Sequence, residues 1–381
     1  MSRIKESRNS DLSRRGRILG LLALNLLVLI VSLGVLEIYL RHHQSYVVEQ
    51  RETRLKKIGL IESNPEFLVH YTPKGRRLIP NAHVLIRHHN LSGRDIKIDI
   101  NSLGFRDREL LLIKAADELR VLVLGDSITF GDYLEADEVY VEQAEKVLQA
   151  AMPGRKIEVV NGGVGDVGLK EEVDILEERG LSLNPDVVVI AFYLNDSRPP
   201  WGFPGEEGSY GFLRRHSVLA QSVYRRLLLT RWVREKGKSR FEWTIAAKNS
   251  QWQQSPELFN QMVAKAQYDW GAAWKEESWP GIDRQLQRLQ ALQAQHRFSV
   301  AVMVFPVKYQ VYADFLDDTP QQRMRHEAEK FGFAYLDLLP LLRAKNRPPL
   351  FYDHCHPKEP ANALIGQALA EFLQQELFSH R

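Results

Sequence analysis

Apolar residues along this chain form runs of different length and period, and the longest run comes first. Residues 18–36 contain no charged side chain, and only Asn25 and Ser32 among them are polar. A helix of this length extends about 28 Å, which is close to the thickness of a bilayer core. Basic residues dominate the stretch before the run, and no small-x-small cleavage site precedes Glu37. We therefore predict a cytoplasmic tail over 1–17 and an uncleaved membrane anchor over 18–40, with everything after it outside the inner membrane.

Two short runs that follow alternate apolar and polar residues. His83–Arg87 and Ile96–Ile100 have the period of two that is typical of exposed antiparallel strands. The stretch from Asn101 to Asp107 then turns the chain toward the next region. These patterns predict a small β-containing region over 41–118, which we call the lead-in.

From Arg120 onward, continuous apolar runs alternate with segments of helical period. A continuous run of this length indicates a strand buried on both faces, as in a parallel sheet. Strands are predicted at 120–124, 157–160, 187–192, 299–305 and 334–338, and helices at 139–151, 170–178, 282–296, 321–330 and 361–377. This alternation predicts an α/β domain over 119–381, with three layers, α/β/α, around a parallel sheet.

The alternation is interrupted at about 197–281, a segment that we call the insertion. It contains all seven tryptophans and a basic, partly apolar stretch from Leu213 to Arg240. We predict that it is helical, and two interpretations stay open. It can be a subdomain with its own small core, or a lid or platform whose indole rings stack on sugars or lie at a bilayer interface.

Charge and cysteine content narrow the possible partners. The formal net charge is only +3, and much of the basic excess lies in the N-terminal tail, so the composition does not indicate a nucleic-acid partner. Cys355 is the only cysteine, which excludes an internal disulfide and is compatible with a periplasm-like space.

The first candidate for chemistry follows the first predicted strand of the α/β domain. Gly125-Asp126-Ser127 comes where a parallel sheet of this kind binds ligands, at the carboxyl edge of its strands. Ser127 would begin a helix, whose first N–H groups are available to an anion. The motif therefore suits a nucleophile, although Asp126 or Ser127 can also simply cap the helix.

A glycine-rich loop, Asn161 to Gly168, follows the second strand. Its glycines formally match the dinucleotide fingerprint G-x-G-x-x-G, but that fingerprint belongs in the first strand–helix unit of a domain. We expect instead that the loop turns a backbone N–H toward a developing oxyanion. Asn195 follows the third strand, where its amide can donate to the same oxyanion or can form an Asx turn.

The last candidate loop lies before the closing helix. Asp353 and His356 are three residues apart, which lets the carboxylate orient the imidazole toward a serine. Asp353, His354, Cys355 and His356 are also all metal-ligand types. Adjacent residues rarely converge on one ion, and no second ligand cluster with a recognisable spacing is present.

Together these four blocks resemble the SGNH (GDSL-type) hydrolase family. Gly125 to Gly131 is similar to its nucleophile block, Asn161 to Gly168 to its glycine block, Asn195-Asp196 to its asparagine block, and Asp353 to His356 to its closing block. The resemblance covers about residues 119–378 and implies a flavodoxin-like SGNH hydrolase fold. The anchor and the Gly104-Phe105-Arg106 stretch also resemble membrane-anchored members associated with surface polysaccharides.

The resemblance implies a role for each motif residue. Ser127, Asp353 and His356 would form the catalytic triad, and the oxyanion hole would consist of the N–H groups of Ser127 and Gly165 with the amide of Asn195. No metal or organic cofactor is implied. The family pattern Asn-x-Gly-x-x-Gly ends here at Asp166, so Gly163 or Asp166 are alternative donors to Gly165.

The implied function is that of a membrane-anchored serine esterase acting outside the cytoplasm on an acylated glycan, lipid or small molecule. An O-acyltransferase that modifies a surface polysaccharide is the alternative, because it differs only in the acceptor of the acyl group. A third hypothesis, from another class, is an inactive scaffold or binding protein of the cell envelope.

Overall fold

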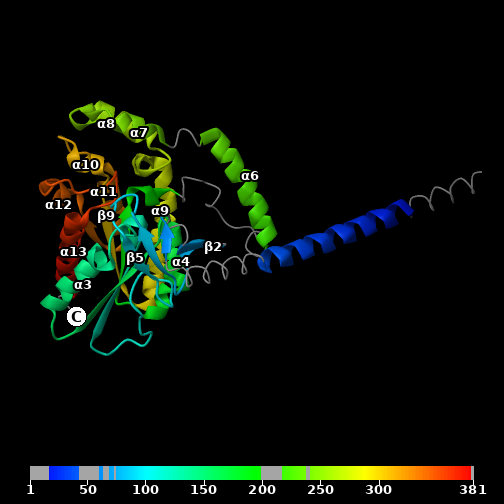
Figure 1. The fold of residues 1–381 in the computed structure, drawn as a ribbon, viewed down its shortest axis with the longest axis horizontal. Coiled ribbons are helices and arrows are strands. Elements are labelled where there is room, and N and C mark those ends of the chain that lie inside the picture. Colours follow the sequence, from blue (N-terminus) through cyan, green and yellow to red (C-terminus); the bar gives the residue numbers. More distant parts are fainter. Residues whose placement is uncertain are drawn as a thin grey trace, which may run out of the picture. The chain divides into compact units, whose positions relative to one another are not determined.

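The computed structural model describes residues 17–42, 60–62, 68–72, 74–198, 217–236 and 241–378 (Figure 1). The chain divides into two compact units. One consists of Met1–Gln50 with Ser209–Leu227, and the other of Arg51–Gly208 with Leu228–Arg381. The candidate chemistry lies entirely in the second unit.

A five-stranded sheet forms the centre of the second unit. All its strands are parallel, and their order across the sheet is β10-β9-β8-β6-β7. The strands are β6 (Glu118–Gly125), β7 (Lys156–Gly163), β8 (Val187–Tyr193), β9 (Ser299–Phe305) and β10 (Ala334–Asp337). Counted along the chain, this is the flavodoxin-like order 2-1-3-4-5, whose switch point lies beside the first strand. The predicted three-layer fold with a parallel sheet is confirmed.

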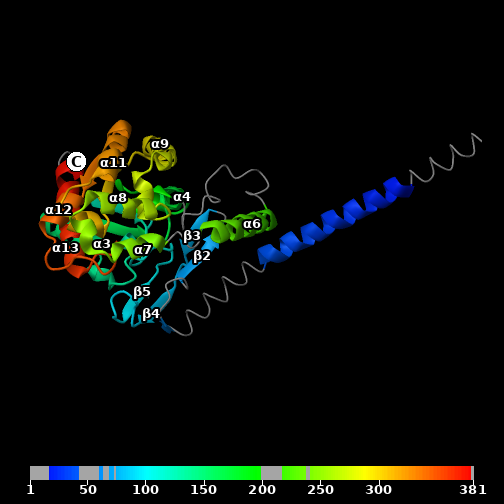
Figure 2. The same cartoon turned by 90° about the horizontal axis from the view of Figure 1, so that it is seen from above.

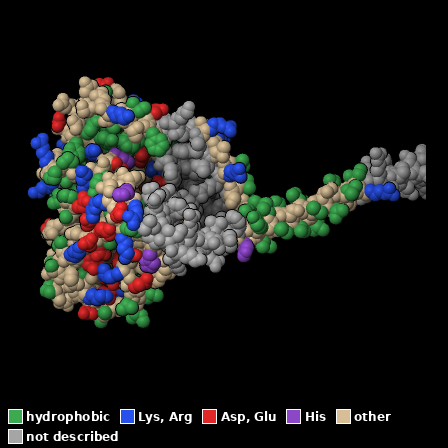
Figure 3. All heavy atoms as spheres, in the orientation of Figure 1, with side chains coloured by type: hydrophobic (Ala, Val, Ile, Leu, Met, Phe, Trp, Pro, Cys, Tyr) green, Lys and Arg blue, Asp and Glu red, His purple; other side chains and the backbone are tan. Residues whose placement is uncertain are grey.

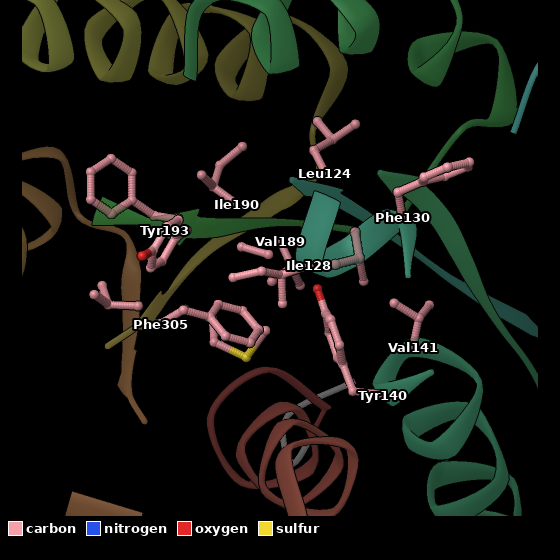
Figure 4. Close-up of a cluster of buried hydrophobic side chains, with 14 of the residues drawn as sticks. Leu124, Ile128, Phe130, Tyr140, Val141, Val189, Ile190, Tyr193 and Phe305 are labelled. Atoms are coloured by element: carbon pink, nitrogen blue, oxygen red, sulfur yellow. The ribbon is translucent and has the colours of Figure 1, made fainter. Parts of the chain in front are cut away.

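Helices cover both faces of this sheet, as Figure 4 shows for the region around β6 and β8. The helices α3 and α13 lie side by side on one face, while α4 and α9 pack together on the other (Figure 1 and Figure 2). Their bounds are α3 (Tyr140–Ala151), α4 (Leu169–Glu178), α9 (Trp279–His296), α11 (Thr319–Phe331) and α13 (Glu359–Leu373). Each predicted helix is present, with its ends shifted by a few residues. Because β6 is buried along its whole length, its carboxyl end holds whatever follows it in a fixed position.

The lead-in contains the two predicted strands and packs into the main core. β4 (His83–Arg87) and β5 (Ile96–Asp99) pair antiparallel, and β1 (Leu60–Glu62) extends that sheet beside β4. A separate hairpin joins β2 (Val69–Thr72) to β3 (Gly75–Leu78). Buried side chains of the lead-in belong to the same hydrophobic cluster as those of the five-stranded sheet. The lead-in therefore has no separate core among the described residues.

The insertion is helical, as predicted, with α6 (Val218–Lys236), α7 (Glu242–Ala247) and α8 (Pro256–Lys265). Its tryptophans do not form the separate core that one interpretation expected. Trp243, Trp252, Trp270 and Trp279 are buried within the same hydrophobic cluster as the sheet, and Trp274 packs against it. The four buried indoles therefore serve the main core, while Trp274 is partly exposed. Trp201 and the side chain of Trp232 lie outside the described residues.

One described helix, Arg17–His42, is long and apolar enough to cross a membrane by length and composition. Its apolar window has a mean hydropathy of 2.7, and none of that window is buried. Figure 3 shows hydrophobic side chains over the visible face of this helix. The predicted anchor over 18–40 lies within it.

Candidate active site

The predicted loops meet at one edge of the sheet because the strand register brings them there. Gly125 at the end of β6 lies opposite Gly163 of β7 and Ala191 of β8. Ser127, Gly165 and Asn195 follow these three strands, so all three lie at the carboxyl edge of neighbouring strands. The loop with Asp353 and His356 comes from the far end of the chain and completes the group through its contact with Ser127.

Ser127 begins α2 (Ser127–Phe130), a helix of only four residues. Asp126 caps it, because its side chain accepts a hydrogen bond of 2.9 Å from the N–H of Ile128. Gly131 ends it in the left-handed conformation, with φ of 66°, and donates to the carbonyl of Ser127. The capping role considered for this motif thus belongs to Asp126, which leaves the Ser127 hydroxyl available for another partner.

The strand β7 supports α2 from one side. A Cβ atom on Gly163 would lie 2.2 Å from the nitrogen of Phe130, so only a glycine allows this close approach. On the other side, the hydroxyl groups of Thr129 and Tyr140 are 2.7 Å apart, and Figure 4 shows the Tyr140 ring pointing from α3 toward α2. The helix that begins with Ser127 is therefore held between β7 and α3.

Ser127, His356 and Asp353 form a continuous chain of hydrogen bonds. The Ser127 Oγ atom lies 2.9 Å from His356 Nε2, and His356 Nδ1 lies 2.8 Å from Asp353 Oδ2. The other carboxylate oxygen of Asp353 accepts from the backbone N–H groups of Cys355 and His356, at 2.9 Å and 2.8 Å. Since an ionised carboxylate can only accept, Nδ1 donates to Asp353 and Nε2 is left to accept the serine proton.

The electrostatics of the pair suit a base held by a carboxylate. Burial by itself lowers the pKa of His356, but the charge of Asp353 and its hydrogen bond to the ring outweigh this and raise the pKa. Burial by itself would raise the pKa of Asp353, but the charge of His356 and the hydrogen bonds from it hold that pKa well below its usual range. Asp353 is therefore ionised while it orients the imidazole.

Three hydrogen-bond donors at this edge have no partner among the residues that the structure describes. They are the backbone N–H groups of Ser127 and Gly165 and the side-chain N–H₂ of Asn195. The Oδ1 atom of Asn195, an acceptor, is buried and also has no partner among the described residues. The N–H of Gly163, by contrast, donates to Asn161 Oδ1 at 3.0 Å and is engaged within its own loop. All three residues are partly exposed, so their open donors are accessible to a group of the substrate.

Asp166, where the family pattern has glycine, takes the left-handed conformation with φ of 54°. Its carboxylate lies 3.5 Å from a guanidinium nitrogen of Arg76 and 3.7 Å from one of Arg198. Arg76 belongs to the lead-in and Arg198 follows the Asn195 turn. Asp166 thus ties the glycine-rich loop to its two neighbours.

Three buried acids lie behind the nucleophile. Burial raises the pKa of Asp126 to about 6 and raises those of Glu172 and Asp196 well above the usual carboxyl range. The charge of Asp126 raises the pKa of both Glu172 and Asp196 further, and that of Glu172 raises the pKa of Asp196. The raised pKa values of Glu172 and Asp196 favour their neutral forms, which limits the negative charge behind Ser127.

The alternative of a metal site rests on Asp353, His354 and Cys355, whose ligand atoms all lie within 4.8 Å of one another. Both oxygens of Asp353 already accept hydrogen bonds from the chain. Burial raises the pKa of the Cys355 thiol, which keeps it protonated, whereas a metal ligand is a thiolate. The His354 ring packs against Trp243 of the insertion, with ring centroids 4.8 Å apart. This donor set fits a metal ion poorly.

Two residues at the site carry no signal in the sequence. Tyr133 packs the edge of its ring against His356, with centroids 5.0 Å apart, and thereby limits the rotation of the imidazole. Arg106 of the lead-in contacts the end of α2. The Gly104-Phe105-Arg106 stretch was noticed through its resemblance to membrane-anchored family members, but nothing in its pattern indicated contact with the nucleophile helix.

No protein-family model and no curated protein matches the chain. Among solved structures, a catalytic mutant of the acetylxylan esterase Axe2 from Geobacillus stearothermophilus is 16% identical, with 70% of this chain and 98% of that chain covered and a TM-score of 0.40. LAE5, an α/β hydrolase enzyme from the metagenome of Lake Arreo, Spain, is 15% identical over 69% of this chain and 97% of its own, with a TM-score of 0.39.

A two-domain esterase active on acetylated mannans also matches, with 15% identity, 68% of this chain and 50% of that chain covered, and a TM-score of 0.38. Similarities at this level carry no argument about chemistry. What the site can do has to be inferred from its own geometry.

Proposed function

We propose that this chain is a serine hydrolase that cleaves an ester by transferring its acyl group through Ser127. The observation that carries the proposal is the continuous hydrogen-bonded chain from Ser127 Oγ through His356 to Asp353. A serine is a weak nucleophile on its own, and a neutral imidazole within hydrogen-bond distance is what activates it.

In the first half of the reaction, Ser127 Oγ forms a bond to the ester carbonyl carbon while its proton passes to His356 Nε2. The negative charge that develops on the carbonyl oxygen is held by the N–H groups of Ser127 and Gly165 and by the Asn195 amide. Asp353 stabilises the imidazolium. The carbon–oxygen bond to the alcohol then breaks, and the alcohol leaves with the proton from His356.

In the second half, His356 takes a proton from water as the water attacks the acyl-serine. The same three donors hold the second oxyanion. The bond to Ser127 breaks, the serine regains its proton from His356, and the acid is released. A sugar hydroxyl in place of water would make the same site an O-acyltransferase.

The substrate that we propose is an acylated glycan or lipid outside the cytoplasm. The apolar helix Arg17–His42, preceded by basic residues, supports a single-pass anchor in the inner membrane with the N-terminus inside. A periplasm-specific reporter fused after Arg381 should then be active. Activity of a cytoplasm-specific reporter at that position would contradict both the orientation and the location.

Turnover of 4-nitrophenyl acetate by the purified full chain tests the chemistry. We expect steady release of nitrophenol by the wild type and a covalent acyl group on Ser127, which mass spectrometry detects after acid quenching and hydroxylamine removes as a hydroxamate. Ser127→Ala is the matched control, because it removes only the hydroxyl. Adding a sugar acceptor and identifying the acylated product separates a hydrolase, which yields free acid, from an acyltransferase. Equal rates for the wild type and for Ser127→Ala would contradict the proposal.

A further inference from the structure

Arg106 of the lead-in is buried against the chain that follows the nucleophile helix. Its guanidinium donates to three backbone carbonyls: that of Phe130 at 2.8 Å, that of Gly131, and that of Leu134 at 2.6 Å. The charge also lies 5.7 Å from the centre of the Phe130 ring. A buried guanidinium is costly, and here its hydrogen bonds go to carbonyls rather than to a carboxylate.

Phe130 is the last residue of α2, Gly131 is its C-cap, and Leu134 lies in the turn that follows. The last carbonyls of any helix lack a partner within the helix, and a helix of four residues is too short to be stable through its own hydrogen bonds. The negative end of the peptide dipoles also favours a cation at this end. Arg106 supplies both the donors and the charge that α2 needs to keep its position.

A second contact from the same turn reaches the other side of α2. Asp107 Oδ2 accepts a hydrogen bond of 2.9 Å from the N–H of Asn161 in β7. The Asn161 side chain then donates to the carbonyl of Thr129 at 2.8 Å and accepts from the N–H of Gly163 at 3.0 Å. Asp107 thus fixes the asparagine that links α2 to the glycine-rich loop.

The turn that carries Arg106 and Asp107 is itself held rigidly. Asn101 Oδ1 accepts from the N–H groups of Leu103 and Phe105, at 3.0 Å each, and the Asn101 amide donates to the carbonyl of Arg108 at 2.9 Å. Phe105 is buried in the main core. A turn with this many internal bonds places the two following side chains with little freedom.

We propose that residues 101–107 of the lead-in are part of the catalytic apparatus, with Arg106 as the positioning residue that fixes α2 and thereby the distance between Ser127 and His356. This inference rests on the proposed serine chemistry. It makes the region between the membrane helix and the α/β domain necessary for turnover and not only for attachment. Arg106 touches no reacting atom, so its loss should act on the chemical step and not on binding.

Arg106→Lys and Arg120→Lys form a matched pair for the test. Both arginines are buried, but Arg120 lies at the opposite end of β6 from Ser127. We expect both variants to unfold at lower temperature. Only Arg106→Lys should lose kcat, by about 10²-fold, with KM nearly unchanged, because displacement of a reacting group by about 1 Å has an effect of that size. Rates are compared per folded chain.

Hydrogen exchange of the peptide 126–134 gives a second measurement that needs no activity. In Arg106→Lys the amides of α2 should exchange at least about tenfold faster than in the wild type, while Arg120→Lys should leave them unchanged. If the lysine variants do not fold, Arg106→Gln and Arg120→Gln replace them, since glutamine keeps two N–H donors without the buried charge.

The proposed serine chemistry and the proposed role of Arg106 can be contradicted independently. A wild type without turnover or acyl-serine would remove the serine chemistry, whereas the exchange rates would still report on α2. If Arg106→Lys has the kcat of Arg120→Lys, or if the peptide 126–134 exchanges equally in both, Arg106 contributes to stability alone and the inference is overturned.

Discussion

The two ends of strand β6 differ in whether their polar groups have hydrogen-bond partners within the protein. At the amino end, every nitrogen of the Arg120 guanidinium donates a hydrogen bond, including bonds of 2.6 Å to Glu118 and to Glu158. At the carboxyl end, the N–H of Ser127 and the amide of Asn195 have no partner among the described residues. Arg120 is fully buried, whereas Ser127 and Asn195 are partly exposed, so a group left without a partner costs more at the amino end.

The difference indicates what each end does. A satisfied buried network contributes to the folded state and offers nothing to a ligand. Partly exposed donors without a protein partner, next to a hydroxyl within hydrogen-bond distance of an imidazole, stay open to a substrate oxygen. Substitutions at the two ends should therefore separate stability from activity.

The largest effect should come from Ser127→Ala at the carboxyl end. Turnover should fall by about 10⁴–10⁶-fold, because the nucleophile is lost and only the binding groups remain. The midpoint of thermal unfolding should hardly change, since the hydroxyl contributes one hydrogen bond at a partly exposed position. Steady-state kinetics and calorimetry on the same preparation measure both. A large drop in stability would mean that this end is structural too.

Arg120→Met at the amino end should reduce stability and leave activity unchanged. Its removal takes the fully buried cation from two buried carboxylates, Glu118 and Glu158, and leaves them with Lys156 and Arg108 at the surface. This loss should lower the free energy of unfolding by about 3 kcal/mol. Denaturant titration measures this loss. The value of kcat per folded chain should equal that of the wild type, and a change in kcat would show that the two ends of β6 are coupled.

Asn195→Ala removes one of the three open donors and should act on the transition state. We expect kcat to fall by about 10²–10³-fold, as for the loss of one oxyanion donor, with a much smaller change in stability. Asn195→Asp is a useful companion, because it keeps the shape and replaces the N–H₂ donor with a charge that repels an oxyanion. Wild-type kcat in Asn195→Ala would remove Asn195 from the oxyanion hole.

The smallest of the predicted effects is on the pH dependence. Because His356 must be neutral to accept the serine proton, kcat/KM should fall as the pH drops through its raised pKa, by about tenfold per unit. That acid limb should lie above the ordinary histidine value of about 6.5. Asp353→Asn removes the charge that raises the pKa, so the limb should move to lower pH. An unmoved limb in this variant would assign the titration to another group.

The sheet and its edge loops could be predicted because their signals are local. Apolar runs such as Val187–Phe192 are continuous only where both faces of a strand are buried, and parallel strands bring their carboxyl ends to one edge. The short helices α10 (Lys308–Tyr312) and α12 (Leu339–Ala344) were missed, because one turn of helix leaves almost no period to detect.

The contacts between distant segments could not be predicted. Arg106 holds carbonyls that lie 24 to 28 residues further along the chain, and no periodicity relates them. The burial of Trp243 and Trp270 depends on Tyr309 and His354, which come from α10 and the closing loop. An aromatic residue has the same sequence signal whether its face is covered or open, so the burial of these two indoles could be learned only from the structure.

Covalent labelling of the full chain by a fluorophosphonate is the most direct test of the central claim, which is that the carboxyl end of β6 holds an activated serine. Peptide mass spectrometry before and after treatment with a chelator locates the adduct and tests the metal alternative together. The serine chemistry predicts one adduct per chain, on Ser127, that is absent in His356→Ala and unaffected by the chelator. No adduct on Ser127, or labelling that chelation abolishes and zinc restores, would contradict it.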